Sequence, residues 1–593
     1  MKSSLIKYML MGVLATPLLS SCSDILDKTP LTEIGEEQLW SDPVLVQAFV
    51  NSRYNQVGHG WTESMQSSIV DETELTWLRG CEVHNFARVT PSDLGRMNGG
   101  WYGWDNRSWS TKWNNITNCN IFFERVDEVP FTDEELKNRL KGEVRFLRVF
   151  EYNDLIMRWG AVPLITKSFT INDVDEIRQQ VRASYEDCVN FMVTELDQAA
   201  EELPATYSGD DYGRATSVAA LALKSRILLY AASPLMNENV TMSEIGYTNP
   251  DPDRWQKAAQ AADEAVAAAE AAGYKLLETS STNVTDLAAN YQNIFLDNTS
   301  SNTEVLFARM GTASNLGEGL SSLEQWNFPN GWGGWGGNCP LQELVDDYEV
   351  VNADLTQAEP FNWADPTMAA APYENRDPRF YASILYDGAP WKERTLETYF
   401  TVDASGNITG GGQDTRYGRD DWNTSPTGYN MKKFMDESYV GNSYNFSAKN
   451  WIWLRMAELY LNQAEAWYHA GDENKARTAV NKVRNRAGMP DITSTGTQLL
   501  EDIKHERRIE LVFEEHRYYD VRRWKEADKY LGRTVHAVTV KLYPDGHKTY
   551  EVSDLRSDVG GNRLWDDKMY WLPILRTEVE KNPNLTQNPG YTN

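Results

Sequence analysis

The stretch Trp451–Pro490 reads WIWLRMAELYLNQAEAWYHAGDENKARTAVNKVRNRAGMP. Its first half carries apolar residues at helical spacing, at Leu454, Leu459, Leu461, Ala464, Ala466 and Trp467. Gly471 and Asp472 interrupt this pattern, and a second apolar stripe begins at Ala476. Glycine followed by a capping residue is typical of a helix end and a new helix start. The stretch therefore predicts two antiparallel helices joined by a tight turn.

The segment AWYHAGDENKA within this stretch resembles the tetratricopeptide helix-turn-helix, in which small residues let two helices approach closely. The same periodicity predicts helices over residues 136–158, 185–203, 215–232 and 255–273. Between them lie three segments rich in Gly, Asn, Asp and Trp, at 57–113, 278–340 and 386–450. We interpret these as loops with short hairpins, GNITGGGQD being one hairpin tip. The fold is predicted to be a mainly α helical scaffold with loop insertions.

The N-terminus has the features of an export signal. Lys2 and Lys7 precede an apolar run at residues 8–19 that is too short to span a bilayer. Leu19-Ser20-Ser21-Cys22 then resembles a bacterial lipobox, in which the cysteine is lipidated after cleavage. We predict a signal peptide over 1–21, a lipidated tether over 22–40 starting at Cys22, and an anchored body.

Composition excludes some functions. The 593 residues include 86 acidic and 57 basic ones, for a net charge of −29, so the surface should repel nucleic acid and anionic lipid. The remaining cysteines are far apart and show no CxxC spacing, which favours small apolar core residues over a metal site: Cys81, Cys119, Cys188 and Cys339. No HExxH, GxSxG or Walker motif is present.

The densest charged stretch is ERRIELVFEEHRYYDVRRW at Glu506–Trp524. Two interpretations fit this stretch: an acid-base site, and a network of ion pairs that locks helices together. Glu510 and Glu514 have arginines three or four residues away, which should lower their pKa, whereas a general acid needs a raised one. We therefore expect a structural network, with Arg507 and Arg517 on the same helical face.

Several segments together resemble the SusD/RagB family of outer-membrane lipoproteins, and they follow one another in the family's order. They are Glu143–Thr166, Gly213–Leu235, Asn375–Phe380, Leu454–Ala466, Glu506–Trp524, Tyr570–Ile574 and Asn582–Tyr591. The resemblance implies tetratricopeptide-like helix pairs with an irregular binding half, in N-terminal and C-terminal regions at 41–330 and 331–593. It also implies display on the outer-membrane surface and delivery of a glycan to a SusC-like TonB-dependent transporter, without catalysis.

Aromatic rings on Gly-rich loops suit sugar binding, because the C–H faces of a pyranose stack on flat apolar surfaces. In GGWYGWDNRSWSTKW, Trp109 and Trp113 have helical spacing and are assigned to the scaffold. Trp101, Tyr102 and Trp104, with Asn106, are predicted to form a sugar platform. The other candidate ligand-binding residues are Trp332 and Trp335, from GWGGWGG, and Trp77 and Arg79, which resemble positions near the family's site.

Two other functions stay open at this point. A RagB-like receptor would bind oligopeptides, and a surface glycoside hydrolase would use a carboxylate pair. No cofactor is expected, although a structural Ca²⁺ in an Asp/Asn-rich loop remains open.

Overall fold

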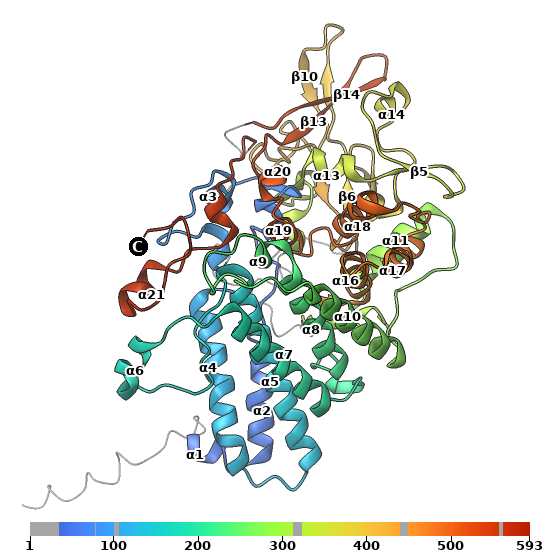
Figure 1. Ribbon diagram of the computed structural model, residues 1–593. Helices are drawn as coiled ribbons and strands as arrows, with labels where there is room; N and C mark the ends of the chain where they lie inside the picture. Colours follow the sequence, from blue (N-terminus) through green and yellow to red (C-terminus); the bar gives the residue numbers. More distant parts are fainter. Residues whose placement is uncertain are drawn as a thin grey trace, which may run out of the picture.

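The structure is a computed structural model that describes residues 35–77, 79–99, 106–311, 323–438, 449–556 and 561–592. Helices dominate, as predicted, and Figure 1 shows them stacked beneath a half built from loops and short strands. The long helices of the stack are α2 (Pro43–Tyr54), α4 (Trp109–Arg125), α5 (Glu134–Trp159), α7 (Tyr185–Glu202), α8 (Ser217–Ala232), α10 (Asp253–Ala271), α16 (Met456–His469), α17 (Glu473–Arg486) and α18 (Gly496–Glu510).

Local chemistry explains where these helices begin and end. Ser108, Asp133 and Ser184 each accept a hydrogen bond from a backbone N–H in the first turn of α4, α5 and α7. Between α16 and α17, Gly471 has a φ of +91°, a conformation that costs glycine little. The four helices predicted from periodicity alone are confirmed, each to within about two residues at either end.

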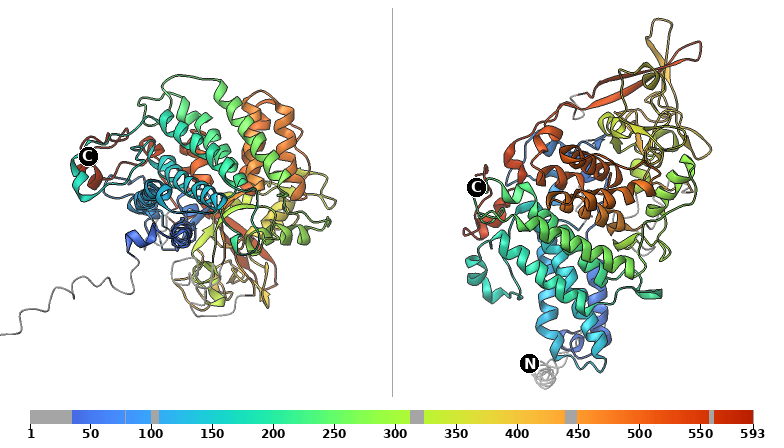
Figure 2. Two further views of the ribbon diagram at one scale, coloured as in Figure 1. Left: turned by 90° about the horizontal axis from the view of Figure 1, so that it is seen from below. Right: turned by 45° about the vertical axis from the view of Figure 1, so that its right-hand side comes forward.

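The stack continues across a long break in sequence. Each helix packs on the next along the series from α4 and α5 through α7, α8 and α10. The next neighbour of α10 is α16, which begins almost 200 residues later in the chain. Buried alanines on α10, including Ala258, Ala262 and Ala265, allow this close approach. Figure 2 (left) shows the stacked helices side by side.

The upper half contains small sheets. Antiparallel pairs join β1 (Thr73–Leu75) to β3 (Asn338–Pro340), β2 (Val305–Arg309) to β12 (Trp451–Arg455), β4 (Val350–Val351) to β5 (Ala358–Glu359), β6 (Ile384–Leu385) to β11 (Asn430–Met431) and β7 (Pro390–Trp391) to β8 (Arg394–Thr395). One larger sheet has the order β10 (Ile408–Gly411), β9 (Phe400–Val402), β13 (His536–Leu542) and β14 (Lys548–Asp554). A hairpin is present, as β9–β10, but GNITGGGQD is not its tip: Ile408–Gly411 within this segment is strand β10, and the turn spans 403–407.

The loop-rich half also contains helices that the sequence analysis missed. The interval 278–340 was expected to lack helices, but α11 (Val284–Leu296) lies within it. Asn283 caps α11, and Leu287, Tyr291 and Ile294 bury one face of it. The remaining helices are short: α1 (Glu36–Leu39), α3 (Cys81–Asn85), α6 (Val174–Gln179), α9 (Pro234–Asn237), α12 (Leu323–Asn327), α13 (Gln342–Asp347), α14 (Pro366–Ala370), α15 (Pro378–Ser383), α19 (Arg517–Arg523), α20 (Ala527–Leu531) and α21 (Arg576–Lys581).

The stretch Trp451–Pro490 begins with a strand and not with the helix that its apolar spacing predicts. WIWLR is strand β12, and the helix begins only at Met456. Trp451 is buried and makes an edge-on contact with Trp61, with 5.8 Å between ring centroids. Trp453 packs against the core of the helical stack and also against that of the loop-rich half. Aromatic and β-branched residues suit such a strand, but a short apolar run does not distinguish strand from helix.

The stretch Glu506–Trp524 is also not one helix. Helix α18 ends at Glu510, and both Phe513 and Glu515 have a φ of +63°, which breaks the helical path before α19. Arg507 pairs with Asp520 within the stretch, whereas Arg517 pairs with Asp71, far away in the chain. The prediction of an ion-pair network is confirmed, but the prediction that Arg507 and Arg517 share one helical face is wrong.

The network converges on Arg455, at the end of β12. Its guanidinium lies 2.7 Å from carboxylate oxygens of Glu304, Glu510 and Glu514, all buried. Burial by itself would raise the pKa of Glu510, but the guanidinium groups around it, led by Arg486 and including Arg455, lower that pKa well below its usual range. Glu510 is therefore a fixed negative charge that ties the helical stack to the loop-rich half.

The four cysteines of the body are buried free thiols, as the small-residue interpretation predicts. Burial raises the pKa of each of them.

Among the described helices, none combines the length and the apolar character needed to cross a membrane. Cys22 and the predicted signal peptide lie outside the described residues.

Candidate functional site

The β1–β3 pair brings two of the predicted site residues into contact. Leu75 is opposite Asn338, and the pairing continues where the Thr76 backbone N–H donates to the Gly337 carbonyl over 3.1 Å. Trp77 follows β1, and Trp335 precedes β3. Their rings meet edge to face, 5.9 Å apart at 88°, and both are half-buried. The two indoles form one aromatic corner with remaining accessible surface.

Arg79 places charge beside this corner. It has a φ of +38°, an uncommon conformation for a residue with a side chain, and such strain is often found at functional sites. Its Nε lies 3.6 Å from Oε1 of Glu63, which is 6% exposed. Burial raises the pKa of Glu63, and Arg79 opposes that shift. Glu63 is not among the predicted site residues, because nothing in the sequence marks it as a neighbour of Arg79.

The glycines of GWGGWGG are required by close backbone packing. Gly333 and Gly336 have φ values of +79° and +54°. A side chain on Gly334 would lie 2.1 Å from the Phe328 carbonyl oxygen. The Trp335 N–H donates to the Gln325 carbonyl over 2.9 Å. The glycines therefore fold the turn onto α12, and this holds the Trp335 backbone in place.

Trp332 has a different set of neighbours. Its Nε1–H donates to Oε1 of Glu393 over 3.1 Å, and the Arg394 guanidinium lies 3.5 Å from the ring centroid. Arg394 is held in turn by Asp414 at 2.8 Å. One face of the Trp332 ring is thus occupied by a cation. Trp332 remains a predicted ligand contact, through its other face or its edge.

Hydrogen bonds around the Asn338 side-chain amide hold β3 in place beside the aromatic corner. The Asn338 side-chain oxygen accepts hydrogen bonds from the Met65 N–H over 3.0 Å and the Ser68 hydroxyl over 2.9 Å. Its Nδ2 donates to the Glu63 carbonyl over 3.1 Å and to Oδ1 of Asn327 over 2.9 Å. Since Asn338 is buried, these bonds satisfy it fully and join β3, α12 and the segment that carries Glu63.

Trp101, Tyr102 and Trp104 lie outside the described residues, but both flanks of their segment are described. Arg158 donates to the carbonyls of Met97 and Arg107 over 3.0 and 2.8 Å, which ties the two flanks together. The Arg96 N–H donates to the Gly80 carbonyl over 3.2 Å. One flank therefore runs directly beside the residue that follows Arg79.

The other flank contains Asn106 and the two tryptophans that were predicted to belong to the scaffold. Asn106 has a φ of +56°, and its Nδ2 donates to the Asn55 carbonyl over 3.3 Å. Trp109 begins α4, is buried, and packs edge-on against Trp159 at 5.1 Å. Trp113 contacts Tyr152 in the same way at 6.0 Å. The assignment of Trp109 and Trp113 to the scaffold is confirmed.

A buried carboxyl just before β1 makes the stability of this region pH-dependent. Burial raises the pKa of Glu72 to about 8, and Arg508 offsets only part of that effect. An unfolded glutamate titrates near 4.5, so across the interval between these values the folded chain binds more protons than the unfolded one. The contribution of Glu72 to stability is therefore greatest below this interval and is lost as the pH rises through it.

We expect Glu72→Gln to reduce the fall in stability between about pH 5 and about pH 8, by up to about 1.4 kcal/mol per pH unit. Urea unfolding midpoints at several pH values measure this slope. Burial also raises the pKa of Glu74, to about 7, but Glu74 is present in both proteins, so the comparison isolates Glu72. Equal slopes in the two proteins would contradict the assignment.

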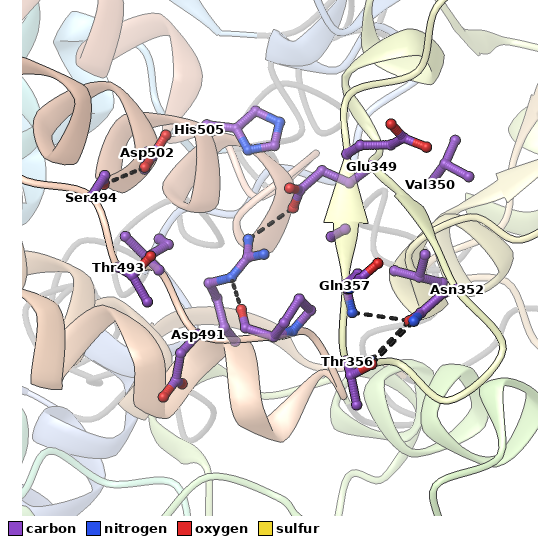
Figure 3. Close-up of a pocket in the computed structure, with 16 residues that line it drawn as sticks. Glu349, Val350, Asn352, Thr356, Gln357, Asp491, Thr493, Ser494, Asp502 and His505 are labelled. Carbon is purple, nitrogen blue, oxygen red and sulfur yellow. Dashed lines mark hydrogen bonds and ion pairs between the residues drawn. The ribbon is translucent and has the colours of Figure 1, made fainter.

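A separate pocket of about 650 Å³ lies between the β4–β5 hairpin and the segment that joins α17 to α18 (Figure 3). Arg484 pairs with Glu349 at 2.8 Å, and the Ser494 hydroxyl donates to Asp502 over 2.5 Å. His505 is the only aromatic residue in its lining. Since the pocket offers no broad ring for stacking, the aromatic corner remains the candidate site.

Within the described ranges, no three His, Cys, Asp or Glu side chains gather to hold a metal ion.

Comparisons with known proteins identify the class. The family model described as "SusD family" matches residues 303–591, and that described as "Starch-binding associating with outer membrane" matches residues 45–229. A SusD-like protein from Bacteroides fragilis NCTC 9343, with a crystal structure, is 30% identical with a TM-score of 0.74. The alignment covers 95% of this chain and 100% of that one. The chain therefore belongs to the SusD family.

Two further similarities extend over nearly the whole chain. A structure described as a SusD-like carbohydrate binding protein from Bacteroides fragilis NCTC 9343 has a TM-score of 0.70 at 23% identity, covering 92% of this chain and 100% of its own. "SusD-like protein P38" of Formosa agariphila is 22% identical over 97% of this chain and 96% of that protein. These similarities support the fold assigned above.

Proposed function

We propose that the protein binds a neutral oligo- or polysaccharide at the aromatic corner without breaking bonds in it. The observation that carries this proposal is the meeting of Trp77 and Trp335, half-buried and held by β1–β3. Indole faces and edges suit the apolar faces of sugar rings, and the neighbouring Arg79–Glu63 pair offers donors and acceptors for hydroxyls. Rigid support lowers the entropic cost of binding.

The same proposal includes Trp101, Tyr102, Trp104 and Asn106 as further contacts. The anchored flanks of their segment, one of which runs beside Gly80, support this. One relative is described as carbohydrate binding, and one matching family model as starch-binding. A net charge of −29 favours neutral over anionic glycans.

The cellular role that we propose is capture at the surface of the outer membrane and handover to a SusC-like TonB-dependent transporter. The lipobox at Cys22 would supply the anchor, and one matching family model is described as associating with the outer membrane. Co-purification of a TonB-dependent transporter with the full-length protein from solubilised outer membranes would test the partnership. A Cys22→Ala variant should lose membrane association because it lacks the lipid.

Affinity electrophoresis in gels that contain amylopectin, laminarin, xylan or mannan tests the ligand class. We expect at least one polysaccharide to retard the protein, and the double variant Trp101→Ala/Trp104→Ala to lose at least about tenfold in affinity, as for rings at binding hot spots. Trp255→Ala, a half-buried tryptophan stacked on His469 in the helical stack, is the matched control. Unchanged retardation of the double variant would remove these rings from the site. Release of sugar products would indicate a hydrolase instead.

A further inference from the structure

Two aromatic side chains are unusually open to solvent. Trp422 is 59% exposed and Tyr417 is 49% exposed, and every other Phe, Tyr or Trp side chain in the described ranges is more deeply buried. Both belong to the loop 412–425, which sequence analysis included in an insertion but did not single out. Large exposed rings on a monomer surface are commonly binding sites, because burial would otherwise be favourable.

The loop 412–425 is firmly attached, so its open rings do not reflect a loose segment. Nδ2 of Asn330 donates to the carbonyls of Thr415 and Asp420 over 3.3 and 2.9 Å. The Gly331 N–H donates to Oδ1 of the buried Asp414 over 3.0 Å. The loop is therefore fixed to the Gly-rich turn that carries Trp332 and Trp335.

The loop also reaches the aromatic corner itself. A side chain on Gly336 would lie 2.7 Å from the Asn423 carbonyl oxygen, so the two backbones are in close contact. Trp422 precedes Asn423, and Trp335 precedes Gly336. Each of the two tryptophans is thus next in sequence to this contact, and the backbone at Trp422 lies close to the backbone at Trp335.

The Tyr417 ring is held by contacts with two neighbouring side chains. Phe400 of β9 packs edge-on against it at 6.2 Å, and the Arg416 guanidinium lies 5.2 Å from its ring centroid. Arg416 also lies 5.7 Å from the Phe400 ring centroid. These contacts restrain the ring while leaving half of it accessible, as a stacking platform requires.

We propose that Tyr417 and Trp422 form a distal subsite that contacts the far end of a neutral glycan whose near end lies at Trp77 and Trp335. This inference rests on the proposed function and adds to it that the protein selects for chain length. Separate rings among Gly, Asp, Asn and Arg suit a sugar chain better than a protein partner. The group of exposed aliphatic residues that would suit a protein partner lies instead on and beside α6, at Ile171, Val174, Ile177 and Val181, whereas Ile408 of β10 is a single such residue beside the loop 412–425.

The test uses calorimetry with a size series, from two to about eight sugar units, prepared from a polysaccharide that retards the wild-type protein. We expect Tyr417→Ala/Trp422→Ala to bind the longest members about tenfold more weakly, which is about 1.4 kcal/mol, and the shortest members unchanged. Trp335→Ala should weaken binding at every length. Ile408→Ala, on the neighbouring β10 and 39% exposed, controls for a surface change, and circular dichroism with urea midpoints verifies folding.

The outcomes separate the two proposals. If Tyr417→Ala/Trp422→Ala binds every length as the wild type does, the distal subsite is wrong and the proposed function stands. Equal weakening at short and long lengths contradicts length selection. If the wild type binds none of amylopectin, laminarin, xylan and mannan, the proposed function and the subsite both fail.

Discussion

Arg455→Ala is expected to destabilise the protein by about 3–5 kcal/mol, the usual cost of removing one partner from a buried ion pair. The arginine is 2% exposed, and its removal takes one buried ion-pair partner from each of Glu304, Glu510 and Glu514. Arg486 still pairs with Glu304 and Glu510, and Lys433 still pairs with Glu514, but the three carboxylates share less positive charge. Arg455→Lys should recover only part of the loss, because an ammonium group cannot reproduce the planar fork that contacts several oxygens.

Urea unfolding, followed in parallel by tryptophan fluorescence and circular dichroism, measures this effect. Lys581→Ala is the matched control, since Lys581 pairs with Glu578 at 2.8 Å but is 70% exposed at the side chain. Its removal should change stability by less than about 1 kcal/mol. If Arg455→Ala were no more destabilising than Lys581→Ala, the network would not be what holds the two halves together.

Trp77→Ala and Trp335→Ala are each expected to weaken glycan binding by about tenfold or more, because each removes half of the aromatic corner. The two effects should not be additive. The rings contact each other at 5.9 Å, so losing one also alters the support of the other. Calorimetry of the wild type, both single variants and the double variant gives the coupling energy.

Trp335→Phe serves as the matched variant, because a smaller ring can retain the edge-on contact with Trp77. It should bind with intermediate affinity, while its urea midpoint stays close to that of the wild type. Strictly additive losses from Trp77→Ala and Trp335→Ala would contradict a single platform. Full affinity in Trp335→Ala would exclude this residue from the ligand surface.

The helices were the most predictable part of the protein. Periodicity and capping residues act over a few positions, and so α5, α7, α8 and α10 follow from the sequence nearly to their ends. Short apolar runs carry less information. WIWLR became β12 because β2 offered it a partner, and a strand needs a partner that the run itself does not contain.

The candidate site was predictable only in part. The Gly-rich aromatic segment indicated Trp335, and the family resemblance indicated Trp77 and Arg79. Their contact with a ligand stays a prediction, and the structure adds that the Trp77 and Trp335 rings meet. Glu63 and Trp422 were missed because their roles depend on neighbours: Arg79 for Glu63, and the Gly336–Asn423 contact for Trp422. Exposure of a tryptophan, as at Trp422, is a property of the fold that no local pattern reveals.

By itself the sequence determined the helical scaffold and the place of Trp109 and Trp113 in it, because these depend on interactions along a few turns of chain. Only the tertiary structure decided that α10 packs on α16, that Glu510 is neutralised by Arg455 and Arg486, and that Trp77 meets Trp335. The physical reason is that packing, desolvation and ion pairing act through space, between residues whose sequence separation carries no trace of their contact.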